Sequence, residues 1–279
     1  ASAILLDPEY GLTAARMRAK NAGLLLAYEN SGYDNTQPGR LPDLLDHWSV
    51  RRLVEAGADC IKILLYYTPF DPPKINETKH AWVERIGGEC AAADVPFFLE
   101  FVGYDPKGGD EKRLAYAKQK PDIVIKSMEE FAKDKYKVDV LKVEIPIDVK
   151  FLKGSKAFNG KEAAYDLEEA KKIFRRQDAS VKKPFIYLSA GVDDDIFRES
   201  LELAIGAGVN FAGVLCGRAT WKDGIPVYGK EGAKALEAWL LDRGVRNIKA
   251  LNTTLAKGAR AWHDKYGGRD QVKALARVK

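Results

Sequence analysis

The stretch Ala56-Gly57-Ala58-Asp59-Cys60-Ile61-Lys62-Ile63-Leu64-Leu65-Tyr66-Tyr67 contains the signals that decide the fold. Its glycine can adopt the left-handed conformation that ends a helix, and an almost continuous apolar run follows within three residues. The same order recurs at Ala207-Gly208-Val209, just before the apolar run Phe211–Cys216. Apolar runs that follow such short helix-to-strand loops are typical of a parallel sheet with helices on both faces.

Apolar runs of this kind alternate with helix-like stretches along the whole chain. We expect seven strands, at Ala3–Leu6, Leu24–Tyr28, Cys60–Tyr67, Pro96–Val102, Val138–Ile145, Phe185–Leu188 and Phe211–Cys216. We expect helices at Asp43–Ala56, Asn76–Ala93, Pro121–Ala132, Lys161–Arg176, Asp193–Ala207, Lys230–Arg243 and Ile248–Asp264. No linker or composition break divides residues 1–279, so we expect a single α/β domain.

Seven such strands fit either a doubly wound sheet or a (β/α)8 barrel. The glycine-rich phosphate loops of doubly wound nucleotide folds follow none of the strands, which favours the barrel. A TIM barrel needs one strand more than the sequence supplies.

Composition excludes several classes of protein. The formal net charge of the 279 residues is +5, and basic and acidic residues are interleaved, which gives no case for nucleic acid. The apolar runs are too short and too charged to span a bilayer, and Ala1–Leu6 lacks the features of a signal peptide. Three widely spaced cysteines form no disulfide framework, so we expect a cytoplasmic protein.

Charged residues inside the apolar runs are the main functional signal. Lys62, Glu100, Lys142 and Glu144 all lie within predicted strands. Because side chains alternate between the two faces of a strand, Lys142 and Glu144 point to the same side. Buried charges need partners, so these four either form a purely structural ion-pair network or meet a ligand at the mouth of the barrel.

The second interpretation defines a chemistry. A desolvated lysine near another cation loses affinity for its proton and can then attack a ketone to form an imine. Lys142 is the candidate nucleophile, Lys62 the second cation, and Glu100 or Glu144 the group that shuttles protons. These residues predict a Schiff-base lyase that needs no cofactor.

Small residues after the last two strands predict a phosphate site. Ser189 and Gly191 follow one strand, and Gly217 and Arg218 follow the next. Glycine lets backbone N–H groups approach an anion, and the loops after strands seven and eight bind phosphate in many barrels. The alternative is that both glycines only permit tight turns. The three histidines, His47, His80 and His263, show no ligand spacing, so we expect no metal.

Six segments resemble the class I tagatose-bisphosphate aldolases. They are residues Ile4–Gly11, Gly23–Glu29, Phe97–Glu100, Asp139–Glu144, Tyr187–Val192 and Gly213–Trp221, and the similarity runs from residue 1 into the terminal helices. The resemblance implies a (β/α)8 barrel and a metal-free lyase of lactose and tagatose 6-phosphate degradation. Such enzymes cleave tagatose 1,6-bisphosphate to glycerone phosphate and glyceraldehyde 3-phosphate, and some accept fructose 1,6-bisphosphate.

The resemblance also implies roles for individual residues. The imine-forming lysine falls on Lys142, the proton-transfer glutamate on Glu100 and the accessory lysine on Lys62. The glutamate two residues past the nucleophile falls on Glu144. The phosphate-binding residues fall on Ser189, Gly191 and Gly217, with Arg218 beside them.

The family carries an additional N-terminal segment with the first barrel strand and a catalytic aspartate. This sequence starts at what would be the second strand, so we expect a barrel without its first strand. Two other functions stay open: an aldolase for 6-deoxy-6-sulfofructose 1-phosphate, and a non-catalytic regulator that binds sugar phosphates. The sequence also leaves open whether the protein is a homo-oligomer.

Overall fold

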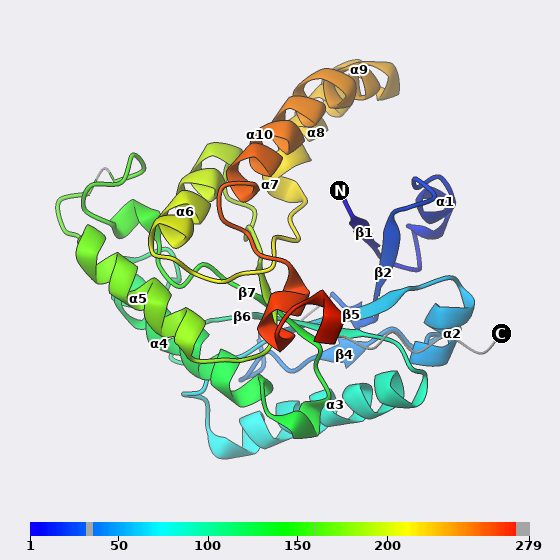
Figure 1. Ribbon diagram of the computed structural model, residues 1–279, viewed down its shortest axis with the longest axis horizontal. Helices are drawn as coiled ribbons and strands as arrows, with labels where there is room; N and C mark the ends of the chain where they lie inside the picture. Colours follow the sequence, from blue (N-terminus) through cyan, green and yellow to red (C-terminus); the bar gives the residue numbers. More distant parts are fainter. Residues whose placement is uncertain (32–35, 159, 272–279) are drawn as a thin grey trace. The chain divides into compact units, whose positions relative to one another are not determined.

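The computed structural model describes residues 1–31, 36–158 and 160–271, and Figure 1 labels most of its helices and strands. The chain forms two compact units. Unit 1 spans Ala1–Pro146 and unit 2 spans Ile147–Lys279. The expectation of one domain over residues 1–279 stays a prediction.

Unit 1 contains five parallel strands in the order β1-β2-β5-β6-β7. Their bounds are β1 (Ala3–Leu6), β2 (Gly23–Ala27), β5 (Cys60–Tyr66), β6 (Phe97–Val102) and β7 (Val140–Val143). The helices are α1 (Leu12–Arg16), α2 (Val50–Glu55), α3 (Pro73–Ala92) and α4 (Leu114–Phe131). A short antiparallel pair, β3 (Glu29–Asn30) and β4 (Asp43–Leu44), follows β2. The expected strands of this unit are confirmed, with bounds that shift by at most two residues.

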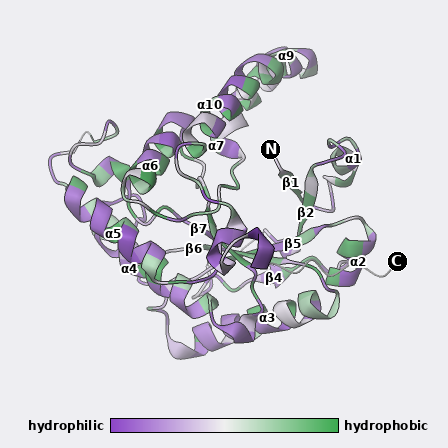
Figure 2. Cartoon of the chain, viewed as in Figure 1, coloured by the Kyte–Doolittle hydropathy of each residue, from purple (hydrophilic) through white to green (hydrophobic). Residues whose placement is uncertain are grey.

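Apolar side chains from these strands form the core of unit 1. Ile61, Ile63, Phe97, Leu99 and Leu141 are completely buried. They alternate with the charged positions of the same strands, so the sheet places apolar side chains on one face and the charges on the other. Figure 2 shows both hydrophilic and hydrophobic residues on α3, as expected for a helix that buries only one side.

The described part of unit 2 contains the strand β8 (Phe185–Tyr187) and several helices. The helices are α5 (Leu167–Ala179), α6 (Asp194–Gly206), α7 (Arg218–Trp221), α8 (Ile225–Glu231), α9 (Ala233–Trp239) and α10 (Val245–Leu255). Its core contains Phe174, Phe185, Tyr187, Phe197 and Phe211, each at most 1% exposed. None of the described helices in either unit is long and apolar enough to cross a membrane.

Several expected elements were wrong in extent. The helix expected at Asp43–Ala56 begins only at Val50, because the side chain of Ser49 caps it, and Asp43–Leu44 forms β4 instead. The strand expected at Phe211–Cys216 contributes one isolated bridge, Tyr187 to Val214, since Gly213 has a φ of 133° that ends extended pairing.

Three of the expected helices also differ. The one expected at Lys161–Arg176 begins at Leu167, where Asp166 and Glu169 form a capping box. The one expected at Lys230–Arg243 is divided by Gly232, with a φ of 82°, into α8 and α9. The last expected helix ends at Leu255, and a 3-10 turn follows at Trp262–Tyr266. Glycine and capping side chains therefore outweighed the periodic apolar pattern at these ends.

Candidate active site

Strand register brings the charged residues of unit 1 together. Lys62 lies opposite Ala27 on β2, Glu100 lies opposite Leu64 on β5, and Lys142 lies opposite Glu100. Opposed residues of parallel strands point to the same face, so these charges share one face of the sheet. Glu29, two residues after Ala27, points to this face as well. We call Glu29, Lys62, Glu100 and Lys142 the Lys–Glu cluster.

The cluster forms one chain of ion pairs. The ammonium Nζ of Lys62 lies 2.5 Å from Oε1 of Glu29 and 2.8 Å from Oε2 of Glu100. The same Oε2 of Glu100 lies 2.7 Å from Nζ of Lys142. No member is more than 9% exposed. One carboxylate oxygen therefore bridges the two lysines, which is the juxtaposition that the sequence predicts for Lys62, Glu100 and Lys142.

The cluster separates the two lysines by their affinity for a proton. Burial lowers the pKa of Lys142, Glu100 opposes the shift, Lys62 adds to it, and the net pKa lies below the ordinary value. Burial also disfavours the charged form of Lys62, but Glu29 and Glu100 outweigh burial and raise its pKa. Lys142 is therefore the lysine prepared to act as a neutral amine, while Lys62 stays a cation.

Glu100 is held in its ionised form. Burial alone would raise the pKa of its carboxyl, but Lys62 and Lys142 together outweigh burial and lower the pKa. A carboxylate that touches the amine of Lys142 can accept a proton from it and return it later. The geometry thus places a base next to the candidate nucleophile.

Glu144 lies beside the cluster with partners of its own. Its Oε1 lies 3.1 Å from Nζ of Lys120 on α4, and its Oε2 accepts a 2.7 Å hydrogen bond from the backbone N–H of Gly103. These contacts connect the end of β7 to α4 and to the residue after β6. The predicted role of Glu144 as a group that shuttles protons stays a prediction.

Glu29 is the member of the cluster that was not predicted from the sequence. A signal existed, because Glu29 directly follows the expected strand Leu24–Tyr28, at the strand end where barrel enzymes place their chemistry. Its Oε1 contacts Lys62, whereas its buried Oε2 accepts no hydrogen bond within the described part of the chain. A buried carboxylate oxygen in that state is suited to accept a hydrogen bond from a bound ligand.

The predicted phosphate residues lie in unit 2, where the structure brings them together. Gly191 has a φ of 72°, and a side chain there would meet the guanidinium carbon of Arg218 at 3.2 Å. Ser189 is buried two residues earlier, and Gly217 directly precedes Arg218 at the start of α7. Gly191 and Arg218 therefore form adjacent parts of one surface.

Lys222 supports this surface and was not selected from the sequence. Its Nζ donates a 2.9 Å hydrogen bond to the carbonyl oxygen of Gly191 and lies 2.5 Å from Oδ1 of Asp193. A lone lysine in a polar stretch gives no sequence signal that would reveal this contact. The lysine fixes the turn after β8 to the segment after α7.

The histidines take part in packing and local contacts. His80 lies 3.0 Å from the hydroxyl of Tyr67 through its Nε2 and packs against the rings of Phe131 and Tyr136. His263 lies beside Asp264. Across residues 1–31, 36–158 and 160–271, no three His, Cys, Asp or Glu side chains gather in an arrangement that would hold a metal ion.

Replacing Lys62 with methionine should raise the pKa of Lys142, because Lys62 is a cation that lowers it. The pH midpoint for imine formation with a small ketone, measured by the rate of borohydride trapping, should therefore move upward. A Lys118→Met control, on the exposed surface of α4, should keep the original midpoint. A midpoint that stays in place or falls in the Lys62 variant would contradict the role of this lysine.

The family model and the similar proteins point to the same family of aldolases. A family model described as DeoC/LacD family aldolase matches residues 1–223. Tagatose 1,6-diphosphate aldolase 2 of Enterococcus faecalis is 54% identical to this chain over 265 residues, which cover 95% of this chain and 79% of that protein. The segments that carry the resemblance noted in the sequence lie within the matched region.

Solved structures show the same fold at low identity. Fructose-bisphosphate aldolase from Plasmodium falciparum has a TM-score of 0.63 at 14% identity, over 93% of this chain and 78% of that chain. An archaeal fructose-1,6-bisphosphate aldolase, with its catalytic lysine covalently bound to a carbinolamine intermediate, has a TM-score of 0.53 at 15% identity, over 91% of this chain and 78% of that chain. These likenesses confirm the expected α/β fold of the (β/α)8-barrel type.

Proposed function

Because this chain belongs to the DeoC/LacD aldolase family, we propose that it is a class I aldolase that cleaves tagatose 1,6-bisphosphate. The products are glycerone phosphate and glyceraldehyde 3-phosphate. The observation that carries the proposal is the buried Lys142, whose pKa is lowered and whose Nζ lies 2.7 Å from Glu100. The relative from Enterococcus faecalis, named for this substrate, supports the choice of sugar.

The reaction begins with imine formation at Lys142. The neutral amine attacks the C2 carbonyl carbon, and the resulting carbinolamine loses water to give an iminium ion. Glu100 accepts the proton that the amine gives up and returns one to the departing hydroxyl. Glu100 suits this exchange because its carboxylate already contacts Nζ of Lys142.

Carbon–carbon cleavage then uses the iminium ion as an electron sink. Removal of the proton from the C4 hydroxyl lets the C3–C4 bond break, and its electron pair moves toward the iminium nitrogen to form an enamine. Glyceraldehyde 3-phosphate leaves, C3 of the enamine is protonated, and water releases glycerone phosphate from Lys142. Glu100 is the main base in these steps, and Lys62 and Glu29 hold substrate hydroxyls.

The C1 phosphate is assigned to Ser189, Gly191, Gly217 and Arg218. The close approach of Arg218 to Gly191 supports this assignment, because a guanidinium beside a backbone position without a side chain suits a phosphate dianion. The C4 epimer fructose 1,6-bisphosphate is an expected second substrate. We place the protein in the cytoplasm, where sugar phosphates are metabolised.

Borohydride reduction in the presence of glycerone phosphate tests the proposed function directly. The reduced adduct should map to the peptide that contains Lys142, and the untreated enzyme should release glyceraldehyde 3-phosphate from tagatose 1,6-bisphosphate. An adduct on another lysine would contradict the assigned nucleophile. Substrate binding without turnover would favour the regulatory protein instead.

A Gly191→Val substitution should weaken binding of the C1 phosphate. Its φ of 72° strains any side chain, and the new methyl groups would displace Arg218. We expect KM to rise by about 10–100-fold, because the displaced Arg218 would lose a charge-assisted hydrogen bond to the phosphate. Gly208→Val is the matched control, because its φ of 83° imposes similar strain with no neighbour within 4 Å. Equal KM values for the two variants would contradict the assigned phosphate site.

A further inference from the structure

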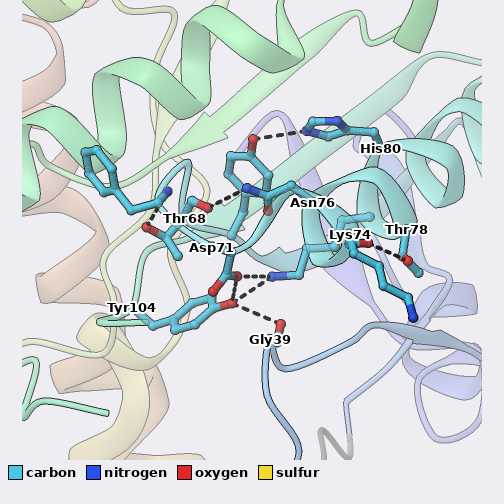
Figure 3. A network of polar contacts seen from close by, with 11 residues as sticks. Gly39, Thr68, Asp71, Lys74, Asn76, Thr78, His80 and Tyr104 are labelled. Atoms are coloured by element: carbon cyan, nitrogen blue, oxygen red, sulfur yellow. Dashed lines mark hydrogen bonds and ion pairs between the residues drawn. The ribbon is translucent and has the colours of Figure 1, made fainter. Parts of the chain in front are cut away.

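A second buried polar network lies in the loops that follow three strands of unit 1. Figure 3 shows Tyr104, from the loop after β6, pointing toward Asp71 and Gly39. The hydroxyl of Tyr104 contacts the carboxylate of Asp71, accepts from Nζ of Lys79 at 2.8 Å, and lies 3.0 Å from the carbonyl oxygen of Gly39. We call Asp71, Lys79 and Tyr104 the latch.

The latch is unusually well protected for a charged group. Lys79 is completely buried on α3 and lies 3.1 Å from Oδ2 of Asp71, which is also buried. An ion pair buried to this degree gives up its hydration, so its net contribution to stability is small. Among the described residues, the backbone group outside the latch that its side chains bind is the carbonyl of Gly39. The hydroxyl of Tyr104 therefore connects the latch to the Gly39–Arg40 segment.

Gly39 and Arg40, next to this contact, both have a left-handed backbone conformation. Gly39 has a φ of 89° and Arg40 a φ of 45°, and a side chain at Gly39 would strike Ile75 at 2.5 Å. A residue other than glycine with positive φ is uncommon, and such strain concentrates at ligand-binding positions. This backbone conformation sets the direction in which the Arg40 side chain leaves the chain.

The guanidinium of Arg40 lies between two aromatic rings. Its central carbon is 5.0 Å from the ring centre of Tyr66 and 4.7 Å from that of Tyr104. Its Nη2 lies 2.8 Å from Oε1 of Glu111, and both side chains of this pair are partly exposed, at 26% and 34%. The cation is thus fixed on two sides and reachable by a ligand that displaces Glu111.

Arg40 also lies toward the correct end of the sheet. Tyr66 lies four residues after Lys62 on β5. An even separation puts both side chains on the same face, which is the face that carries the Lys–Glu cluster. Leu64 is in register with Glu100, and Glu100 with Lys142. Tyr66 is therefore about 7 Å beyond the level of Lys142 toward the carboxyl ends of the strands, a span that a phosphorylated hexose can bridge.

We propose that Arg40 binds the C6 phosphate of the substrate and so selects bisphosphates over monophosphates. This inference rests on the proposed function. A guanidinium offers a phosphate two parallel N–H donors, and its fixed position between Tyr66 and Tyr104 removes part of the entropic cost of binding. Tyr104 acts as a positioning residue, because it contacts both the Arg40 side chain and the Gly39 carbonyl.

Kinetics with tagatose 1,6-bisphosphate and with tagatose 1-phosphate test the proposal. In Arg40→Gln, kcat/KM for the bisphosphate should fall by about 10–100-fold, the loss expected for a charged hydrogen bond, and kcat/KM for the monophosphate should stay within about twofold. Tyr104→Phe should shift the same ratio in the same direction by a smaller factor. Arg113→Gln, which changes a highly exposed arginine in the same segment as Tyr104 and Glu111, should leave both values unchanged.

Glu111→Gln gives a test that misfolding cannot imitate. It removes the carboxylate that competes for Arg40, so KM for the bisphosphate should fall by a few-fold while KM for the monophosphate stays the same. Equal effects of Arg40→Gln on both substrates, or no effect of either variant, would overturn the inference. Borohydride trapping with glycerone phosphate on the same variants separates this failure from that of the proposed function, since absence of an adduct in the unsubstituted enzyme would overturn both.

Discussion

Replacing Lys142 with methionine should abolish turnover and borohydride trapping together. Methionine fills much of the same volume but cannot form an imine, so the covalent route is lost. We expect kcat to fall by about 10⁴–10⁶-fold, the range seen when a nucleophile is removed. The measurement is the rate of glyceraldehyde 3-phosphate release, with mass spectrometry of the reduced adduct.

The matched control for this variant is Lys118→Met, which removes an exposed lysine from α4 in the same unit. It should keep both turnover and the adduct. Because Glu100 still pairs with Lys62 in the Lys142 variant, the cluster retains a counter-ion and the fold should persist, which circular dichroism can verify. A reduced adduct that survives the loss of Lys142 would remove this residue from the mechanism.

Replacing Glu100 with glutamine should separate imine formation from proton transfer. Turnover should fall by about 10²–10⁴-fold, the usual contribution of a positioned acid or base. The pKa of Lys142 should fall further, because Glu100 is the group that raises it against burial. The pH midpoint of borohydride trapping should therefore move downward, opposite to the shift expected for Lys62→Met.

Lys62→Met and Glu100→Gln should shift the pH midpoint of borohydride trapping in opposite directions, so the two variants together are a sensitive test of the Lys–Glu cluster. If burial alone set the pKa of Lys142, neither substitution would move the midpoint. If Glu100 only held the fold, Glu100→Gln would lower turnover by unfolding and leave the midpoint of the folded fraction unchanged. Glu129→Gln, at an exposed position on α4, is the control that should change neither quantity.

The sequence by itself determined the class of fold and the face on which the chemistry lies. Apolar runs that alternate with helices require a covered parallel sheet, and the period of two in a strand places Lys142 and Glu144 on one side. Lys62 and Glu100 were visible for the same reason, since a charge inside an apolar run contrasts with its neighbours. These inferences need only local geometry, which the sequence encodes directly.

Only the tertiary structure decided which charges meet. Period two gives Lys142 and Glu144 the same face, but strand register puts Lys142 against Glu100, while Glu144 contacts Lys120 and Gly103. Glu29 entered the cluster because β2 and β5 pair with Ala27 opposite Lys62. Register depends on packing between segments distant in sequence, so no local pattern fixes it.

The same distinction applies to Arg40 and Tyr104. Neither residue stands out in the sequence, because an arginine or a tyrosine in a polar loop is usually a surface residue. Their roles depend on a backbone with positive φ and on a hydroxyl that reaches across three loops. Electrostatic effects act over a few ångströms, so the pKa shifts in the Lys–Glu cluster follow from distances that only the folded chain sets. The position of the Arg40 side chain also depends on the folded chain.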